Sequence, residues 1–131
     1  MQWDDSVNGG FTEGQPWFPV NPNYKTINVK AQLSNEHSVL NFYKKLIKLK
    51  KSDDIYTYGQ FDLVDADNSK IFAYTRTLGD KTVVVAANLT KTEAKLNLPF
   101  DITHAKIKLH NYPSEVILER VQPYECFVAE L

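Results

Sequence analysis

The sequence predicts a mainly β protein: a C-terminal antiparallel Greek-key β-sandwich, preceded by a long loop and one amphipathic helix. The sandwich is predicted because residues 55–131 contain short β-rich runs that turn residues interrupt about every 8–12 positions. The helix is predicted because apolar residues recur three or four positions apart between residues 39 and 50. Glycines and prolines break every regular pattern before residue 29, which indicates a loop. We therefore expect two parts, residues 1–54 and residues 55–131.

The loop over residues 1–28 is richer in aromatic side chains than a flexible linker. It carries Trp3, Phe11, Trp17, Phe18 and Tyr24. A loop of this length within a compact domain is usually functional or belongs to a larger structure. Aromatic rings in ordered loops often pack as a small satellite core, and Trp and Tyr rings also stack on sugars. Both interpretations stay open, with packing the more common outcome.

The predicted helix should begin near Ser34 or Asn35, because either side chain can cap the first turn, where Glu36 adds a favourable negative charge. Its apolar stripe consists of Val39, Leu40, Tyr43, Leu46 and Ile47. Lysines fill the opposite face and the last turn, which is typical of a solvated face with favourable charge at the helix end.

Seven strands are predicted in the second part of the chain. They lie near residues 57–64, 70–78, 81–89, 93–98, 104–110, 115–120 and 124–131. Turns are expected at 67–69, 79–80, 99–101 and 112–114. Residues 83–87 are apolar throughout, which favours a central strand. The two facing apolar layers should include Phe61, Leu63, Phe72, Val84, Leu96, Ile107, Leu109 and Phe127.

Charge and composition argue against several classes of partner. Fifteen Lys plus Arg and sixteen Asp plus Glu give a formal net charge of −1, so no basic field exists for nucleic acid or anionic lipid. The longest apolar run is far shorter than the ~20 residues of a membrane helix, and the N-terminus lacks a signal-sequence pattern. The single cysteine, Cys126, fits a reducing compartment. We expect a cytoplasmic protein without nucleic-acid or membrane partners and without a cofactor.

The carboxylates form no pattern that predicts catalysis or metal binding. The adjacent pairs Asp4-Asp5 and Asp53-Asp54 should point apart and act as caps or turn formers. The run from Asp65 to Ser69 resembles the opening of a calcium loop. However, Lys70 stands where that loop needs glycine, and Arg76 stands where it needs glutamate. A hairpin turn explains the same residues.

Histidines and the cysteine give no better candidate. His37, His104 and His110 are too far apart in the sequence to predict a metal site. Cys126 lies in a predicted strand without a nearby histidine, so a packed thiol is the favoured interpretation. The glycosylation sequon that begins at Asn88 falls at the end of a central strand, and we discount it.

The first 29 residues resemble the segment that follows the last catalytic region in family 13 glycoside hydrolases of the oligo-1,6-glucosidase type. That segment has the form MQWD, Asn-Ala/Gly-Gly-Phe, Pro-Trp, VNPNY and INV. These motifs correspond here to Met1–Asp4, Asn8–Phe11, Pro16-Trp17, Val20–Tyr24 and Ile27–Val29. Asn41–Lys51 is similar to the last barrel helix of the family, and Pro123-Tyr124-Glu125 is similar to its final sandwich strand.

The resemblance implies a catalytic (β/α)₈ barrel, with residues 1–54 at its end. It also implies that the enzyme hydrolyses glycosides with retention of anomeric configuration. The family's Asp nucleophile, Glu acid/base and second Asp all precede the segment matched by Met1, so we expect no catalytic residue in this chain. The resemblance also implies that the substrates of the parent enzyme are α-linked gluco-oligosaccharides. The loop that matches residues 1–17 follows the eighth barrel strand, where barrel active sites are built. The expected rim of the substrate site, in a positioning role only, consists of Trp3, Asp4, Asp5 and Phe11.

The leading hypothesis is therefore part of an α-glucosidase whose sandwich stabilises the catalytic barrel. A stand-alone carbohydrate-binding module and a structural domain without a ligand remain the alternatives. Without the barrel, the helix would lack the surface that buries Leu40, Tyr43 and Ile47. Such an exposed stripe should promote self-association.

Overall fold

The computed structural model describes residues 1–113 and 116–131. It divides into two compact units, Met1–Lys45 and Leu46–Leu131. The predicted turn at 112–114 and the predicted strand at 115–120 each include a residue outside the described part. Among the described helices, none combines the length and the apolar composition that crossing a membrane requires.

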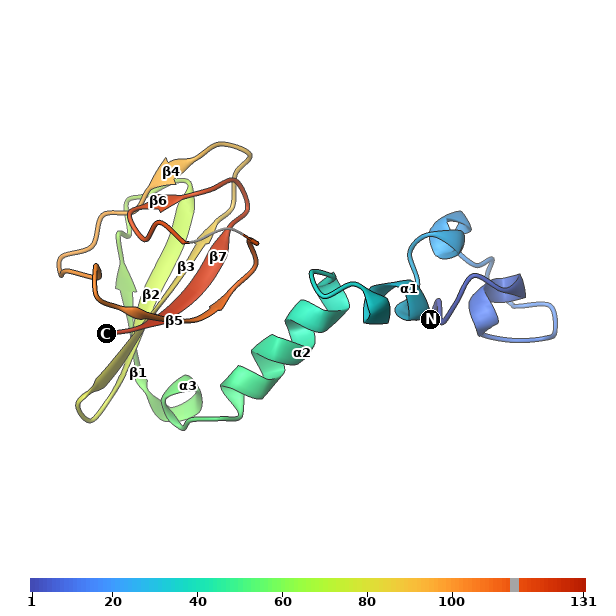
Figure 1. Ribbon diagram of the computed structural model, residues 1–131, viewed down its shortest axis with the longest axis horizontal. Coiled ribbons are helices and arrows are strands. Elements are labelled where there is room, and N and C mark those ends of the chain that lie inside the picture. Colours follow the sequence, from blue (N-terminus) through green and yellow to red (C-terminus); the bar gives the residue numbers. More distant parts are fainter. Residues whose placement is uncertain (114–115) are drawn as a thin grey trace. The chain divides into compact units, whose positions relative to one another are not determined.

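The first unit contains more regular structure than the sequence predicted. The loop includes two short 3₁₀ helices, η1 (Val7–Gly10) and η2 (Pro22–Lys25), and α1 (Val29–Ser34) follows directly (Figure 1). The prediction of an unbroken loop before residue 29 was therefore wrong at these short turns. It missed them because isolated turns of helix have no apolar periodicity to mark them.

The amphipathic helix α2 (Val39–Lys50) begins later than predicted. The Oγ atom of Ser38 accepts a hydrogen bond from the Asn41 amide at 3.2 Å, so Ser38 takes the position of the N-cap. Ser34 instead ends α1, and the side chain of Asn35 accepts from the His37 amide at 3.0 Å within the connecting turn. The expected cap at Ser34 or Asn35 was wrong because a turn of helix already occupies that stretch.

The second unit is an antiparallel β-sandwich that follows a single helical turn, α3 (Ile55–Tyr58). Its strands are β1 (Gln60–Val64), β2 (Ile71–Leu78), β3 (Lys81–Asn88), β4 (Ala94–Lys95), β5 (Lys106–His110), β6 (Arg120–Val121) and β7 (Cys126–Glu130). One sheet has the order β1-β2-β3-β7-β5, and β4 pairs with β6 in a second, two-stranded sheet. Every strand pair is antiparallel. The predicted mainly β fold is confirmed.

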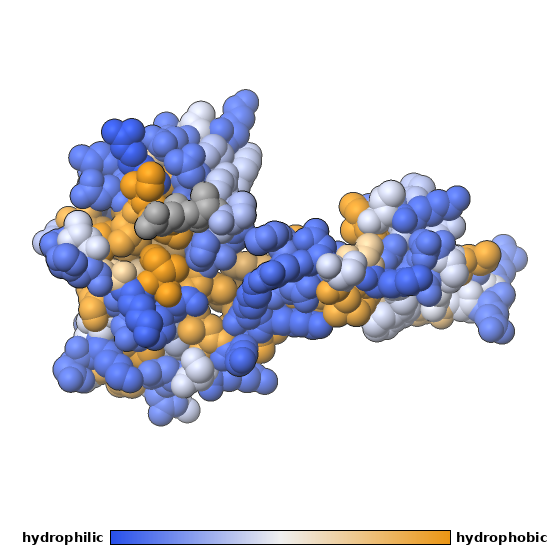
Figure 2. Space-filling model, viewed as in Figure 1, coloured by the Kyte–Doolittle hydropathy of each residue, from blue (hydrophilic) through white to orange (hydrophobic). Residues whose placement is uncertain are grey.

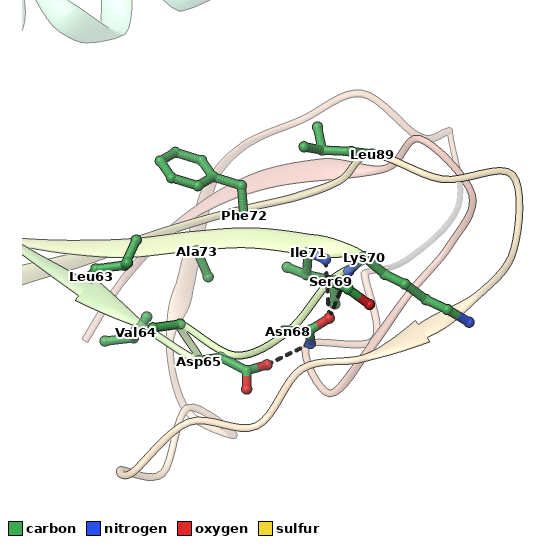
Figure 3. Close-up of a pocket in the computed structure, with 11 residues that line it drawn as sticks. Leu63, Val64, Asp65, Asn68, Ser69, Lys70, Ile71, Phe72, Ala73 and Leu89 are labelled. Carbon is green, nitrogen blue, oxygen red and sulfur yellow. Dashed lines mark hydrogen bonds between the residues drawn. The ribbon is translucent and has the colours of Figure 1, made fainter.

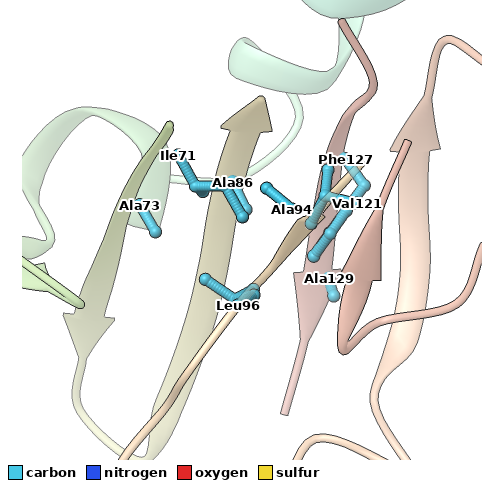
Figure 4. Close-up of a cluster of buried hydrophobic side chains, with 8 residues drawn as sticks. All are labelled: Ile71, Ala73, Ala86, Ala94, Leu96, Val121, Phe127 and Ala129. Atoms are coloured by element: carbon cyan, nitrogen blue, oxygen red, sulfur yellow. The ribbon is translucent and has the colours of Figure 1, made fainter. Parts of the chain in front are cut away.

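The core lies on the face of the five-stranded sheet that the β4–β6 sheet covers (Figure 4). It joins small and large apolar side chains from both sheets: Ile71, Ala73, Ala86, Ala94, Leu96, Val121, Phe127 and Ala129. Of the predicted core residues, Val84, Leu96, Leu109 and Phe127 are buried, and Ile107 is half-buried.

Three predicted core residues lie on the opposite face of the large sheet. Phe61, Leu63 and Phe72 are each about half exposed. Figure 3 shows why: Phe72 projects to one side of β2 and its neighbour Ala73 to the other, toward the core. The prediction was wrong because both faces of β2 carry apolar residues, and the pattern does not say which face the second sheet covers. Figure 2 shows apolar surface among the hydrophilic side chains of this unit.

Candidate functional site

The beginning of the chain is folded back on η1 by backbone hydrogen bonds. The carbonyl of Gly9 accepts from the amide of Trp3 at 2.7 Å and from the amide of Asp4 at 3.2 Å. Gly10 has a positive φ of 66°, and a Cβ atom there would lie 2.7 Å from Oδ1 of Asp4. Glycine at this position thus permits both the turn and the close approach of the carboxylate.

The carboxylate of Asp4 is held by the residue two positions along the chain. Its Oδ1 atom accepts from the backbone amide of Ser6 at 2.9 Å and from the Ser6 hydroxyl. The side-chain and backbone hydrogen bonds from Ser6 lower the pKa of Asp4 below its ordinary value, and the charge of Lys30 adds to this effect. Asp4 therefore stays ionised and fixed in place.

The other three predicted rim residues surround this turn in sequence and are open to solvent. Asp5 forms an exposed ion pair with Lys30, with 3.5 Å between Oδ1 and Nζ. Trp3 and Phe11 both expose half or more of their surface. Trp3 is tied to Gly9, and Asp4 approaches Gly10, the residue before Phe11. The structure thus brings the two ends of the turn together, with the Asp4 carboxylate anchored and two aromatic rings exposed.

The loop aromatics do not form the buried satellite core that was the more common expectation. Trp3, Phe11, Trp17 and Phe18 are all exposed, and only Tyr24 is half-buried. The loop is instead held by polar contacts: the side chain of Asn8 donates to the carbonyls of Thr12 at 3.1 Å and Gly14 at 3.0 Å. These hydrogen bonds satisfy two backbone carbonyls and link the two ends of this part of the loop.

Sequence reasoning missed a hollow of about 500 Å³ on the first unit, beside Trp17. Its lining consists of Val7, Asn8, Gln15, Pro16, Trp17, Pro19, Val20 and Tyr24. The sequence shows the Pro16-Trp17 motif. It does not show that the folded loop brings residues of η1 and Tyr24 next to that motif.

The acidic turn after β1 has a structural explanation. The Oδ2 atom of Asp65 accepts from the side chain of Asn68 at 2.6 Å (Figure 3). It also accepts from the amide of Asn97 at 3.1 Å. Asn68 in turn accepts from the amides of Lys70 and Ile71, both at 3.1 Å. The carboxylate therefore closes a hairpin turn and ties it to the segment after β4.

Neither a metal cluster nor a reactive thiol emerges from the described residues. Within residues 1–113 and 116–131, no group of three or more His, Cys, Asp or Glu side chains is placed to hold a metal ion. Cys126 is half-buried, and burial is the main reason that the pKa of its thiol is raised, with a further contribution from the charge of Glu125. A raised pKa disfavours the thiolate and hence a nucleophilic role.

Two family models match consecutive parts of the chain. Residues 1–59 match the alpha-amylase catalytic domain, and residues 61–128 match the maltogenic amylase C-terminal domain. The second match covers just over half of the chain.

Curated relatives match the chain from end to end. The oligo-1,6-glucosidase of Bacillus cereus is 47% identical over 100% of the chain, and that of Parageobacillus thermoglucosidasius is 44% identical over 100%. The chain covers 24% of each relative, so it spans about a quarter of their length.

Solved structures agree with these relationships. The trehalose-6-phosphate hydrolase of Bacillus licheniformis is 36% identical with a TM-score of 0.90, over 98% of this chain and 24% of that one. An isomaltulose synthase of Erwinia rhapontici, solved with its natural substrate sucrose, is 36% identical with a TM-score of 0.87 over the same shares. The chain therefore belongs to the family of the maltogenic amylase C-terminal domain, and the resemblance to family 13 glycoside hydrolases that its sequence predicted is confirmed.

Proposed function

We propose that this chain is part of an α-glucosidase that hydrolyses terminal α-glucosidic bonds of oligosaccharides with retention of configuration. The observation that carries the proposal is the 47% identity to an oligo-1,6-glucosidase, which extends over the loop and the sandwich alike. A sandwich on its own is shared by proteins of many functions, whereas the loop contains the specific motifs.

In this proposal Trp3, Asp4, Asp5 and Phe11 form part of the rim of the substrate site. The geometry supports a positioning role, because the ionised Asp4 carboxylate is fixed by Ser6. Exposed aromatic rings nearby offer stacking surfaces for sugar rings. The rim would orient an α-linked gluco-oligosaccharide for groups supplied by other parts of the enzyme.

The chain by itself should not catalyse hydrolysis. Retention needs a nucleophile and an acid/base, usually two carboxylates about 5 Å apart. Asp4 is engaged by Ser6, and Asp5 is paired with Lys30. The hydrogen bonds from Ser6 favour the ionised form of Asp4, whereas an acid must carry a proton to the leaving group.

The sandwich, which we assign to residues 55–131, would stabilise the catalytic barrel to which residues 1–54 contribute. Support comes from the exposed part of the outer face of the large sheet, which carries Phe61, Leu63 and Phe72. There Tyr74 lies 5.0 Å from Phe61 and 5.6 Å from Phe72 between ring centroids, although Phe61 and Phe72 are half exposed. A neighbouring hollow of about 200 Å³ is lined in part by Leu63, Phe72 and Leu89. Apolar surface of this kind suits a domain interface.

Two further proposals concern the surroundings of the chain. We propose a cytoplasmic location, because a lone half-buried thiol suits a reducing compartment. We also propose that the 131-residue chain self-associates through α2, whose stripe residues Tyr43, Leu46 and Ile47 are exposed. Neither nucleic acid nor a membrane surface is a proposed partner, since the net charge is −1.

A chimera tests the proposed function. This chain would replace the stretch of the Bacillus cereus oligo-1,6-glucosidase that it matches, and isomaltose hydrolysis would be measured for the chimera and for the isolated chain. The chimera should be active and the isolated chain should remain at background. In the chimera, Asp4→Asn should lower kcat/KM about 10–100-fold, since small misplacements of substrate have effects of that size.

The matched control in the chimera is Asp67→Asn, which changes an exposed turn carboxylate distant in sequence from the rim. It should leave kcat/KM unchanged. A chimera that folds but does not hydrolyse isomaltose would contradict the proposal. So would turnover by the isolated chain that disappears on Asp4→Asn or Asp5→Asn.

A further inference from the structure

We infer that the hollow beside Trp17 is a binding site for an uncharged pyranose sugar, separate from the proposed rim. Its volume of about 500 Å³ falls in the range of about 300–1,000 Å³ usual for small-molecule sites. Its lining combines an aromatic ring, a tyrosine and two side-chain amides with proline and valine. None of the lining residues belongs to the proposed rim.

The wall formed by Trp17 offers a stacking surface. Its side chain is 93% exposed, and its ring lies 5.0 Å from that of Phe18 at an interplanar angle of 55°. The tilted contact with Phe18 leaves the indole open to solvent. The C–H groups on one face of a pyranose are apolar and pack on such a ring, as apolar groups do on aromatic surfaces generally.

Two amides supply the polar part of the site. Gln15 makes no hydrogen bond to any residue that the structure describes, so its side chain can both donate and accept. The amide nitrogen of Asn8 is used by the carbonyls of Thr12 and Gly14, which directs the remaining hydrogen-bonding capacity to its oxygen. Sugar hydroxyls donate and accept, and therefore match both groups.

The charge of the lining selects among sugars. None of the eight lining residues carries a charged side chain. Phosphate groups are recognised by arginine, lysine or clustered backbone amides, and a site without them gives a sugar phosphate no additional binding. The site is thus suited to a neutral saccharide.

The floor of the hollow is fixed before any ligand arrives. Gly9 is buried, and a Cβ atom built on it would lie 3.5 Å from Val20 and 3.6 Å from Tyr24, which places η1 against both residues. Pro16 and Pro19 restrict the backbone on either side of Trp17. A preformed wall loses little conformational entropy on binding.

The experiment exploits the fact that the chain has only two tryptophans, Trp3 and Trp17. The complete ¹⁵N-labelled chain gives one indole N–H signal for each, and Trp3→Phe assigns them. Isomaltose is titrated to about 50 mM, and we expect the Trp17 signal to shift with saturation at a Kd of about 1–10 mM, the weak end of the affinity scale. Mannitol, which has no ring, should not shift it, and glucose 6-phosphate should bind no more tightly than glucose.

A pair of variants ties the shift to the lining. Gln15→Ala should raise the Kd about threefold to tenfold, the usual effect of one hydrogen bond. Glu13→Gln, also exposed on the loop but outside the lining, should leave the Kd unchanged. Equal affinities for both variants would overturn the assignment of the site.

Three other results would also overturn the inference. One is a Trp17 signal that stays in place throughout the isomaltose titration. Another is a Trp17 signal that moves with protein concentration in the absence of sugar, because a second copy of the chain would then cover the hollow. The third is a shift of the Trp3 signal alone, which would support the proposed rim and reject the hollow, so the two sites are tested separately.

Discussion

Asn88 illustrates how a single buried side chain joins the two sheets of the sandwich. It is only 2% exposed. Its amide nitrogen donates to the carbonyls of Thr92 at 2.8 Å and of Val121 and Gln122 at 3.0 Å. Its oxygen accepts from the amide and hydroxyl of Thr90. A nitrogen engaged by three carbonyls in the interior does not suit the glycosylation that the local sequon permits in principle.

Replacing Asn88 by aspartate should therefore strongly lower the free energy of unfolding. In Asn88→Asp a carboxylate oxygen would face the carbonyls that the amide now satisfies, and an uncompensated buried charge costs about 3–5 kcal/mol. Urea unfolding at neutral pH measures the loss. Thr90→Ala removes one donor to the same side chain and should cost only about 1 kcal/mol. Similar losses of unfolding free energy for the two variants would show that the three hydrogen bonds from the Asn88 amide nitrogen are not a major source of stability.

At the scale of the element, α3 depends on a carboxylate just before it. Asp53 accepts from the Ile55 amide at 3.1 Å and from Lys81 Nζ at 2.9 Å. These hydrogen bonds, led by that from Lys81, lower the pKa of Asp53. A carboxyl with a lowered folded-state pKa stabilises the fold above its unfolded pKa of about 3.9, and the contribution disappears as the pH falls through the folded value.

Asp53→Asn should therefore lower the free energy of unfolding near pH 7, and its difference from wild type should shrink as the pH falls below the unfolded pKa of about 3.9 and through the lowered folded-state pKa of Asp53. Asp54→Asn is the matched control, since the Asp54 side chain makes no hydrogen bond to the residues that the structure describes. Denaturant unfolding at a series of pH values from neutral down through the acid range is the measurement. A difference between wild type and Asp53→Asn that persists unchanged in acid would contradict the assigned cause.

Prediction from sequence succeeded for elements with a clear period and failed where propensity and context disagree. Five of the seven predicted strands match an observed strand over most of its length, because alternation and turn residues mark them. The other two were largely wrong in extent: the strand predicted at 93–98 is reduced to β4, and the one predicted at 115–120 shares only Arg120 with β6. The predicted start at residue 57 was wrong, since Thr57 and Tyr58 favour strands but lie in α3. The turn is imposed by Asp53 and by Gly59, where a Cβ atom would lie 2.5 Å from the Ile55 carbonyl.

For the whole molecule, sequence alone could not say which apolar residues would be buried. Phe72 is larger than Ala73, yet Ala73 faces the second sheet and is buried. Burial depends on the position of β4 and β6, which the local pattern of β2 does not contain. The candidate site could likewise be predicted only in part from the sequence. The four rim residues came from the resemblance, whereas the hollow beside Trp17 required the folded loop.

Among the described residues, the α2 stripe and the part of the outer sheet face that carries Phe61, Leu63 and Phe72 are both apolar and exposed, and self-association tests which one is used. We expect a dimer through α2 because Tyr43 and Ile47 are at least half exposed, and burying such a side chain is worth about 1.5–3 kcal/mol. Sedimentation is measured at a protein concentration of about 50 µM. This concentration separates a dimer with a micromolar Kd from one with a millimolar Kd, which correspond to binding free energies of about −8 and −4 kcal/mol.

In that measurement Ile47→Lys should convert the dimer to a monomer, since a charge on the stripe cannot be buried without a partner. Phe72→Lys is the matched control, because Phe72 is about as exposed as Ile47 but lies on the sheet face. It should leave the dimer intact. A wild-type monomer would reject self-association altogether. A dimer that dissociates on Phe72→Lys but survives Ile47→Lys would instead place the interface on the sheet, the surface proposed to meet the catalytic barrel.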